Sequence, residues 1–136
     1  MQAETAETSE TVPLKGISEA TAAEILAFRD DRQWLPYHNP KDLAMSVAIE
    51  AGELLEVFQW SGTDLERRER RGELADELAD VLIYAAMLAD RAGLSMDEIV
   101  RAKLAKSDAR YPVDKVRGLG SESYERCRAE ARKAGR

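Results

Sequence analysis

Hydrophobic positions follow a helical period through most of this chain. Apolar residues recur at intervals of three and four, for example at Leu43, Val47 and Leu54, which is the spacing of an amphipathic α-helix. Alanine is abundant, and no pair of alternating apolar segments is joined by hairpin-type turn residues. The pattern predicts an all-α fold of the four-helix-bundle type.

Start and stop signals divide the pattern into helices. Ser18, Asn39 and Ser95 are suitable N-caps, Pro40 suits a first helical position, and Glu98 completes a capping box with Ser95. The expected helices cover residues 19–33, 40–60, 63–91, 95–110 and, more weakly, 121–133. The segment LERRERRGE at 65–73 is so rich in charge that we expect a solvated, ion-paired surface there.

The chain divides into one domain and two tails. Residues 1–16 lack an apolar period and predict a disordered arm. Residues 17–113 form the predicted helical domain, and residues 114–136 form a basic, partly helical tail. Within the domain, the loop WLPYHNP at 34–40 gathers two prolines, two aromatic residues and the chain's one histidine.

Composition excludes several classes of function. The chain has 136 residues, of which 44% are hydrophobic and 34% charged, and no apolar run approaches the ~18 residues of a membrane span. A net charge of -6 argues against binding to a polynucleotide backbone. The chain has one cysteine, Cys127, and one histidine, His38. It can therefore form no internal disulfide and no cysteine-based zinc site. The first residues lack the features of a signal peptide, so we expect a cytoplasmic protein.

Carboxylates occupy unusual positions on the second expected helix. On a helical wheel Glu50 falls inside the apolar stripe of Leu43, Val47 and their neighbours. Glu53 lies just outside this stripe, whereas Glu56 lies far round on the solvent side. The helix therefore presents a carboxylate pair, three residues apart, in and beside its apolar stripe.

The third expected helix is apolar on two sides. One apolar face includes Leu78 and Leu82, and the other includes Ile83 and Met87. A helix of this kind is covered on both sides, here by its own chain and by a partner subunit. The narrow stripe between the two faces carries Glu73, Glu77, Asp80 and Tyr84.

The converging carboxylates predict a cation site. Burying an ionised carboxylate is costly unless it is paired or bound to a metal, and no basic residue occurs between Lys41 and Glu66. Hard oxygen ligands suit Mg²⁺ or Mn²⁺. A di-iron site would need Glu-x-x-His motifs, which the chain lacks. The alternative is that these residues lie at an ordinary helix boundary open to water.

The same residues carry a resemblance to a known family. EAGELLEVFQW at 50–60, followed by DELADVLIY at 76–84, resembles the MazG-like nucleoside triphosphate pyrophosphohydrolases, and most closely their dCTP pyrophosphatase branch. The resemblance covers about residues 19–113. It also includes Trp34, His38, Trp60, Tyr84, Lys103 and the Arg110-Tyr111-Pro112 sequence.

The resemblance implies a fold, a reaction and a set of site residues. Two protomers would complete a four-helix bundle as a homodimer or homotetramer, and the enzyme would hydrolyse a deoxynucleoside triphosphate to the monophosphate and pyrophosphate. The catalytic Mg²⁺ ligands would be Glu50, Glu53, Glu77 and Asp80, with Mn²⁺ as a substitute ion. The substrate-binding residues would be Trp34 and Trp60 around the base, His38 and Tyr84 nearby, and Lys103 and Arg110 at the phosphates.

Departures from the family pattern bear on the substrate. Ile25 stands where the dCTP branch carries a histidine, Ser107 stands where many relatives carry asparagine, and the connection between the carboxylate motifs is shorter. We expect dCTP as substrate, with a modified nucleotide as the alternative. A non-catalytic helical oligomer that binds a partner is the alternative from another class.

Individual residues also have simpler interpretations. Trp34 and Trp60 could be core or interface anchors, and His38 could be bonded to the backbone. Lys103 could be ordinary surface charge, as could Arg110. Sequence also leaves open which carboxylate holds the attacking water, for which we favour Glu53.

Overall fold

The structure, a computed structural model, describes residues 14–135, and its regular elements are all helical. The all-α prediction is therefore confirmed. In chain order the elements are α1 (Glu19–Asp31), α2 (Pro40–Glu56), the 3₁₀ turn η1 (Arg68–Arg70), α3 (Arg71–Arg91), α4 (Met96–Arg110), α5 (Val113–Val116) and α6 (Gly120–Lys133). No helix within residues 14–135 combines the length and apolarity needed to cross a bilayer.

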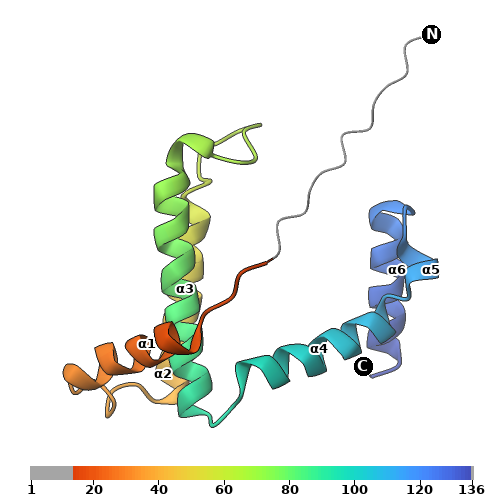
Figure 1. Ribbon diagram of the computed structural model, residues 1–136. Coiled ribbons are helices and arrows are strands. Elements are labelled where there is room, and N and C mark those ends of the chain that lie inside the picture. Colours follow the sequence, from red (N-terminus) through yellow and green to blue (C-terminus); the bar gives the residue numbers. More distant parts are fainter. Residues whose placement is uncertain (1–13, 136) are drawn as a thin grey trace.

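Helices α2 and α3 form an antiparallel hairpin, and α1 lies across one end of it (Figure 1). Helix α4 leaves from that same end and extends away from the hairpin, carrying α5 and α6 at its far end (Figure 1). One chain thus supplies only part of a four-helix bundle, and the dimer expected to complete it stays a prediction.

The predicted helix starts are confirmed by their caps. The side-chain oxygen of Ser18 accepts the backbone N–H of Thr21 at 3.1 Å, and that of Asn39 accepts the N–H of Asp42 at 2.9 Å. Ser95 caps α4 in the same way, with an N–H···O distance of 3.3 Å. These bonds satisfy backbone donors that have no partner inside the helix.

The connection between α2 and α3 is longer than predicted. Helix α2 ends at Glu56 rather than near residue 60, and α3 begins only at Arg71. The backbone turns left-handed at Trp60 (φ 66°) and Arg67 (φ 47°), which interrupts a helix. Asp64 closes this turn by accepting the N–H of Arg67 at 3.1 Å.

The charged segment before α3 does more than face solvent. Its expected ion pairs form, including Arg67 with Glu69 and Arg70 with Glu73. The same two arginines also donate to the backbone carbonyl of Val57, at 3.0 and 3.1 Å. Because cations are favourable at the C-terminus of a helix, Arg67 and Arg70 stabilise the end of α2.

The core is small and lies where α1 crosses the hairpin. It consists of Ile25, Leu43 and Met87, with Ile83, Tyr84, Ala86 and Leu88 packed against it. The Ile83 and Met87 face of α3 is thus covered by its own chain. Leu78 and Leu82, on the other face, are 45% and 41% exposed, so cover from a partner stays a prediction.

The carboxyl end of α3 fixes α1 and the following loop. Arg29 is only 5% exposed, and it donates to Asp90 at 2.6 Å and to Asp30 at 2.7 Å. Hydrogen bonds to Asp30 and Asp90 raise the pKa of Arg29. Arg91 donates to the carbonyl oxygen of His38 at 3.0 Å. Asp90 and Arg91, which are adjacent at the end of α3, therefore hold α1 and the 34–40 loop respectively.

The domain boundaries predicted at 16/17 and 113/114 stay predictions. Residues 1–13 of the expected arm lie outside the described residues, and residues 14–18 are non-helical. The tail contains α5 and α6, so its helical part begins earlier than residue 121.

We expect Asp90→Ala to lower the free energy of unfolding by about 1.5 kcal/mol, the low end for a hydrogen bond to a charged group, because Arg29 keeps Asp30 as partner. Urea unfolding measures the change. Asp97→Ala is the control, since its pair with Arg101 is 79% exposed on both sides and such pairs contribute little. Equal losses in the two variants would contradict the assigned role of Asp90.

Candidate active site

Helices α2 and α3 bring three of the predicted metal ligands together. One carboxylate oxygen from each of Glu50, Glu53 and Glu77 lies within 4.8 Å of the others. Glu50 and Glu53 are three residues apart on α2 and share a face. Glu50 and Glu77 are half-buried, whereas Glu53 is exposed.

The fourth predicted ligand, Asp80, adjoins this cluster from the next turn of α3. Burial raises the pKa of Glu50, and repulsion from Glu53, Asp80 and Glu77 raises it further. Burial is also the largest cause of the raised pKa of Glu77, followed by repulsion from Glu53 and Asp80. Asp80 is therefore close enough to act electrostatically on both.

The charges of this carboxylate cluster, defined as Glu50, Glu53, Glu77 and Asp80, have no counterion in the described part of the chain. None of the ion pairs formed within residues 14–135 includes a cluster member. One oxygen of Glu77, Oε2, is buried without a hydrogen-bond partner. A buried, unpaired carboxylate oxygen is expensive, and several hard oxygen donors at this spacing fit a divalent cation.

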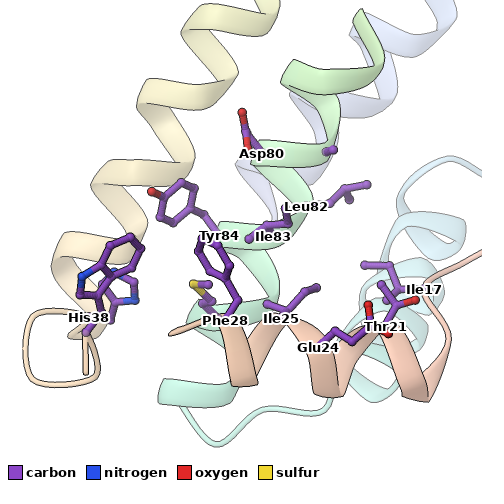
Figure 2. Close-up of a pocket in the computed structure, with 13 residues that line it drawn as sticks. Ile17, Thr21, Glu24, Ile25, Phe28, His38, Asp80, Leu82, Ile83 and Tyr84 are labelled. Carbon is purple, nitrogen blue, oxygen red and sulfur yellow. The ribbon is translucent and has the colours of Figure 1, made fainter. Parts of the chain in front are cut away.

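An apolar cavity of about 570 Å³ adjoins the cluster. Helix α1, the 34–40 loop and α3 line it (Figure 2), and its lining includes Trp34, His38 and Tyr84 together with Asp80. Asp80 thus belongs to both the cluster and the cavity wall. Three of the predicted substrate-binding residues therefore meet beside the predicted metal ligands.

Aromatic rings form a continuous wall of this cavity. Phe28 of α1 packs edge-on against Trp34, with ring centroids 5.7 Å apart. Trp34 lies 5.9 Å from His38, which lies 6.4 Å from Tyr84 on α3. Trp34 is 39% exposed and lines the cavity, so it is not a fully buried core residue. Its roles as a base-stacking residue and as an interface anchor both stay predictions.

One ring nitrogen of His38 has no hydrogen-bond partner in the described residues. The Nδ1 atom of His38 is buried and has no hydrogen-bond partner. It is the backbone carbonyl of this residue, not Nδ1, that Arg91 binds. The interpretation of His38 as a backbone-bonded side chain therefore finds no support at Nδ1.

Three other predicted residues lie away from the cavity in a single chain. Trp60 follows the end of α2 and is 90% exposed. Lys103 is exposed and Arg110 half-buried on α4, which extends away from the α2–α3 hairpin (Figure 1). Their proposed contacts with substrate would need a second chain.

Sequence reasoning missed most of the α1 wall of the cavity, of which it singled out only Ile25. Thr21, Glu24, Ile25 and Phe28 of α1 line the cavity, together with Ile17 just before the helix. The spacing of Thr21, Ile25 and Phe28 at i, i+4 and i+7 is the available signal, since these positions share one helix face. Because this face of α1 mixes polar and apolar residues, its sequence pattern does not mark it as the wall of a cavity.

Comparison with known proteins identifies the family of this chain. Residues 45–125 match the model of the MazG-like family. The chain belongs to the MazG-like family. It is 34% identical over 120 residues to bovine dCTP pyrophosphatase 1, a match that covers 82% of this chain and 71% of the relative. Human dCTP pyrophosphatase 1 is 36% identical over 96 residues, which cover 66% of this chain and 56% of the human protein.

A solved structure supports the fold. The crystal structure of a pyrophosphatase from Archaeoglobus fulgidus DSM 4304 matches with a TM-score of 0.65 and 42% identity. The match covers 74% of this chain and 99% of the archaeal one. The region matched by the MazG-like family model includes the carboxylate cluster but begins after α1 and the 34–40 loop.

We expect Glu50→Gln to raise the thermal unfolding midpoint of the metal-free protein at pH 7. Because the pKa of Glu50 is raised on folding, this group favours the folded state below its ordinary pKa of 4.5. That contribution is lost as the pH rises through the folded-state pKa. The amide of Glu50→Gln carries no charge at any pH. The increase in its unfolding midpoint over the wild type should therefore be present at pH 7 and shrink towards pH 4.

Circular dichroism melts in a chelator measure this gain, with Glu56→Gln, an exposed α2 glutamate, as the control. Excess Mg²⁺ should reverse the order, because binding stabilises the wild-type protein. A metal-free Glu50→Gln protein that melts at or below the wild-type midpoint would refute the assigned repulsion.

Proposed function

We propose that this chain is a Mg²⁺-dependent enzyme that hydrolyses a deoxynucleoside triphosphate, dCTP by preference, to the monophosphate and pyrophosphate. Its broader class, nucleoside triphosphate pyrophosphohydrolase, follows from the MazG-like family and the curated dCTP pyrophosphatase relatives. One observation carries the proposal. The carboxylate cluster and the aromatic cavity share a wall at Asp80, so phosphates and base can be held side by side.

The metal would be held by the carboxylate cluster. Members of the MazG-like family generally depend on a divalent metal, and the Glu50, Glu53 and Glu77 oxygens converge here. Bound Mg²⁺, or Mn²⁺ in its place, would supply electrostatic stabilisation of the charge that builds on the phosphoryl oxygens. An acidic protein could in this way hold an anionic substrate.

The protein's own groups would position the water and the base. Glu53 is the exposed member of the three converging glutamates, which favours it as the acceptor of a proton from the attacking water. Glu50, Glu77 and Asp80 would then hold the metal. Stacking on the aromatic wall would stabilise the base by about 1–3 kcal/mol.

A second copy of the chain would complete the site. Leu78 and Leu82 of α3 are exposed, as are apolar residues of α4 such as Val100 and Leu104. Exposed apolar faces of this kind favour a homodimer or homotetramer. The partner would supply the phosphate-binding Lys103 and Arg110 and the base-stacking Trp60. We also propose a cytoplasmic role in clearing or balancing nucleotide pools.

The exposed apolar α4 also suits the second candidate function, a non-catalytic oligomeric module on the same scaffold. Metal binding separates the two proposals, because only the enzyme requires it. Calorimetry that detects neither Mg²⁺ nor Mn²⁺ binding would favour the module.

Incubation with Mg²⁺ and a panel of standard and modified deoxynucleoside triphosphates should give monophosphate plus pyrophosphate, fastest with dCTP. Glu77→Gln should abolish turnover while the protein stays folded, because Oε2 of Glu77 is a buried oxygen without another partner. Glu56→Gln should retain activity. Release of orthophosphate alone, or no turnover of any nucleotide, would reject the proposed reaction. Faster turnover of a modified nucleotide would change the substrate only.

Mixed oligomers test whether two chains share a site. Glu77→Gln and Lys103→Ala should each be inactive alone. If the two chains share each site, one of the two sites in every mixed dimer keeps both Glu77 and Lys103. About half of the dimers in an exchanged 1:1 mixture are mixed, so the mixture should regain about a quarter of wild-type activity. Lys106→Ala, another exposed α4 lysine, is the control and should be active alone. A mixture that stays inactive after verified subunit exchange would place Lys103 in the same chain's site or outside any site.

A further inference from the structure

Helix α1 contributes a carboxylate to the cavity wall that the reaction chemistry does not use. Glu24 lines the cavity together with Thr21 and Ile25 (Figure 2). It forms no ion pair and no side-chain hydrogen bond within residues 14–135. Thr21, by contrast, already accepts a hydrogen bond from the Ser18 hydroxyl at 3.0 Å.

Glu24 stands one helical turn before the aromatic wall. Residues four apart on a helix are neighbours, with Cβ atoms about 5–6 Å apart, and Glu24 and Phe28 have this spacing on α1. Phe28 in turn packs on Trp34. The Arg32 guanidinium covers one face of Phe28, with Cζ 3.7 Å from the ring centroid. A base stacked on the remaining aromatic surface would present an edge towards the Glu24 carboxylate.

The chemistry of a carboxylate restricts which edge it accepts. An ionised carboxylate has acceptors only, so it needs a donor from the ligand. Cytosine presents an amino group at C4, which Glu and Asp accept, whereas uracil and thymine present a carbonyl oxygen there. Carboxylate and carbonyl oxygens facing each other would both lack a donor. Because Glu24 is exposed in the single chain, this arrangement becomes costly once a bound base displaces the water around the carboxylate.

Apart from Asp80, no other residue within 14–135 that lines the cavity has a side chain that only accepts hydrogen bonds, since the hydroxyls of Thr21 and Tyr84 can donate or accept. Ile25, Ile83 and Met87 are apolar and do not separate amino from carbonyl groups. A neutral histidine such as His38 has one donor and one acceptor nitrogen, so it can satisfy either edge. Asp80 belongs to the carboxylate cluster.

We propose that Glu24 is a specificity-determining residue that selects a base with an exocyclic amino group over its oxo counterpart, and hence cytosine over uracil. This inference rests on the proposed function. It assigns base selection to α1, outside the region matched by the MazG-like family model.

The test compares dCTP with dUTP, which differ in the group at C4. The ratio of kcat/KM for dCTP to that for dUTP should fall about tenfold or more in Glu24→Gln, because the amide offers a donor as well as an acceptor. Glu19→Gln is the matched control, since Glu19 is an exposed α1 glutamate that does not line the cavity. Its ratio should equal that of the wild type.

An unchanged ratio in Glu24→Gln, or equal losses with both nucleotides, would overturn the role of Glu24 while leaving the proposed reaction intact. So would a wild-type protein that does not prefer dCTP to dUTP. Calorimetric titration with each nucleotide keeps the two proposals separable. If the wild type turns over neither nucleotide but binds dCTP more tightly, and Glu24→Gln loses that preference, the reaction fails and the role of Glu24 stands.

Discussion

Repulsion between carboxylates on two packed helices is the constraint around which this fold is arranged. Glu50, Glu53 and Glu77 converge in the middle of the α2–α3 hairpin, where burial makes the charges of Glu50 and Glu77 costly. The stabilising contacts lie towards its two ends. Arg67 and Arg70 hold one end at the carbonyl of Val57, and the core around Leu43 and Met87 lies at the other. In the described part of the chain the cations pair away from the middle, which leaves the charge of the cluster uncompensated, as the proposed metal site requires.

The features best predicted from the sequence are those that depend on local geometry. The N-caps Ser18 and Asn39 and the carboxylate pair on α2 depend on helical period and neighbouring residues alone, so they could be placed without a structure. The end of α2 could not, because the left-handed Trp60 and Arg67 are not glycines. Their turn depends on Asp64 and on bonds to Val57, and such contacts leave no periodic signal.

The candidate site was predictable in part for a similar reason. Trp34, His38 and Tyr84 meet as expected, but the cavity also needs Phe28 and Glu24 of α1, whose face is too mixed in polarity to mark a buried surface. Lys103 and Arg110 show a different limit. The family resemblance predicts that both lie in one site with the carboxylates. In the single chain, however, α4 extends away from the hairpin (Figure 1). A pattern along one chain does not state which copy of that chain completes a site.

The two halves of the site depend on different interactions, and this separates reaction type from substrate choice. The carboxylate cluster depends on the register of α2 against α3, and a shift of one residue there would move carboxylates to another face. The cavity wall depends instead on α1 and the 34–40 loop, which Asp90 and Arg91 attach to the end of α3. Residues that α1 and the loop contribute to this wall can therefore change without moving a carboxylate of the cluster, whereas Asp80 of α3 belongs to both halves. Glu24 is such a residue, because it is exposed on α1 and lines the cavity, whereas its neighbour Ile25 also belongs to the core and is less free to vary.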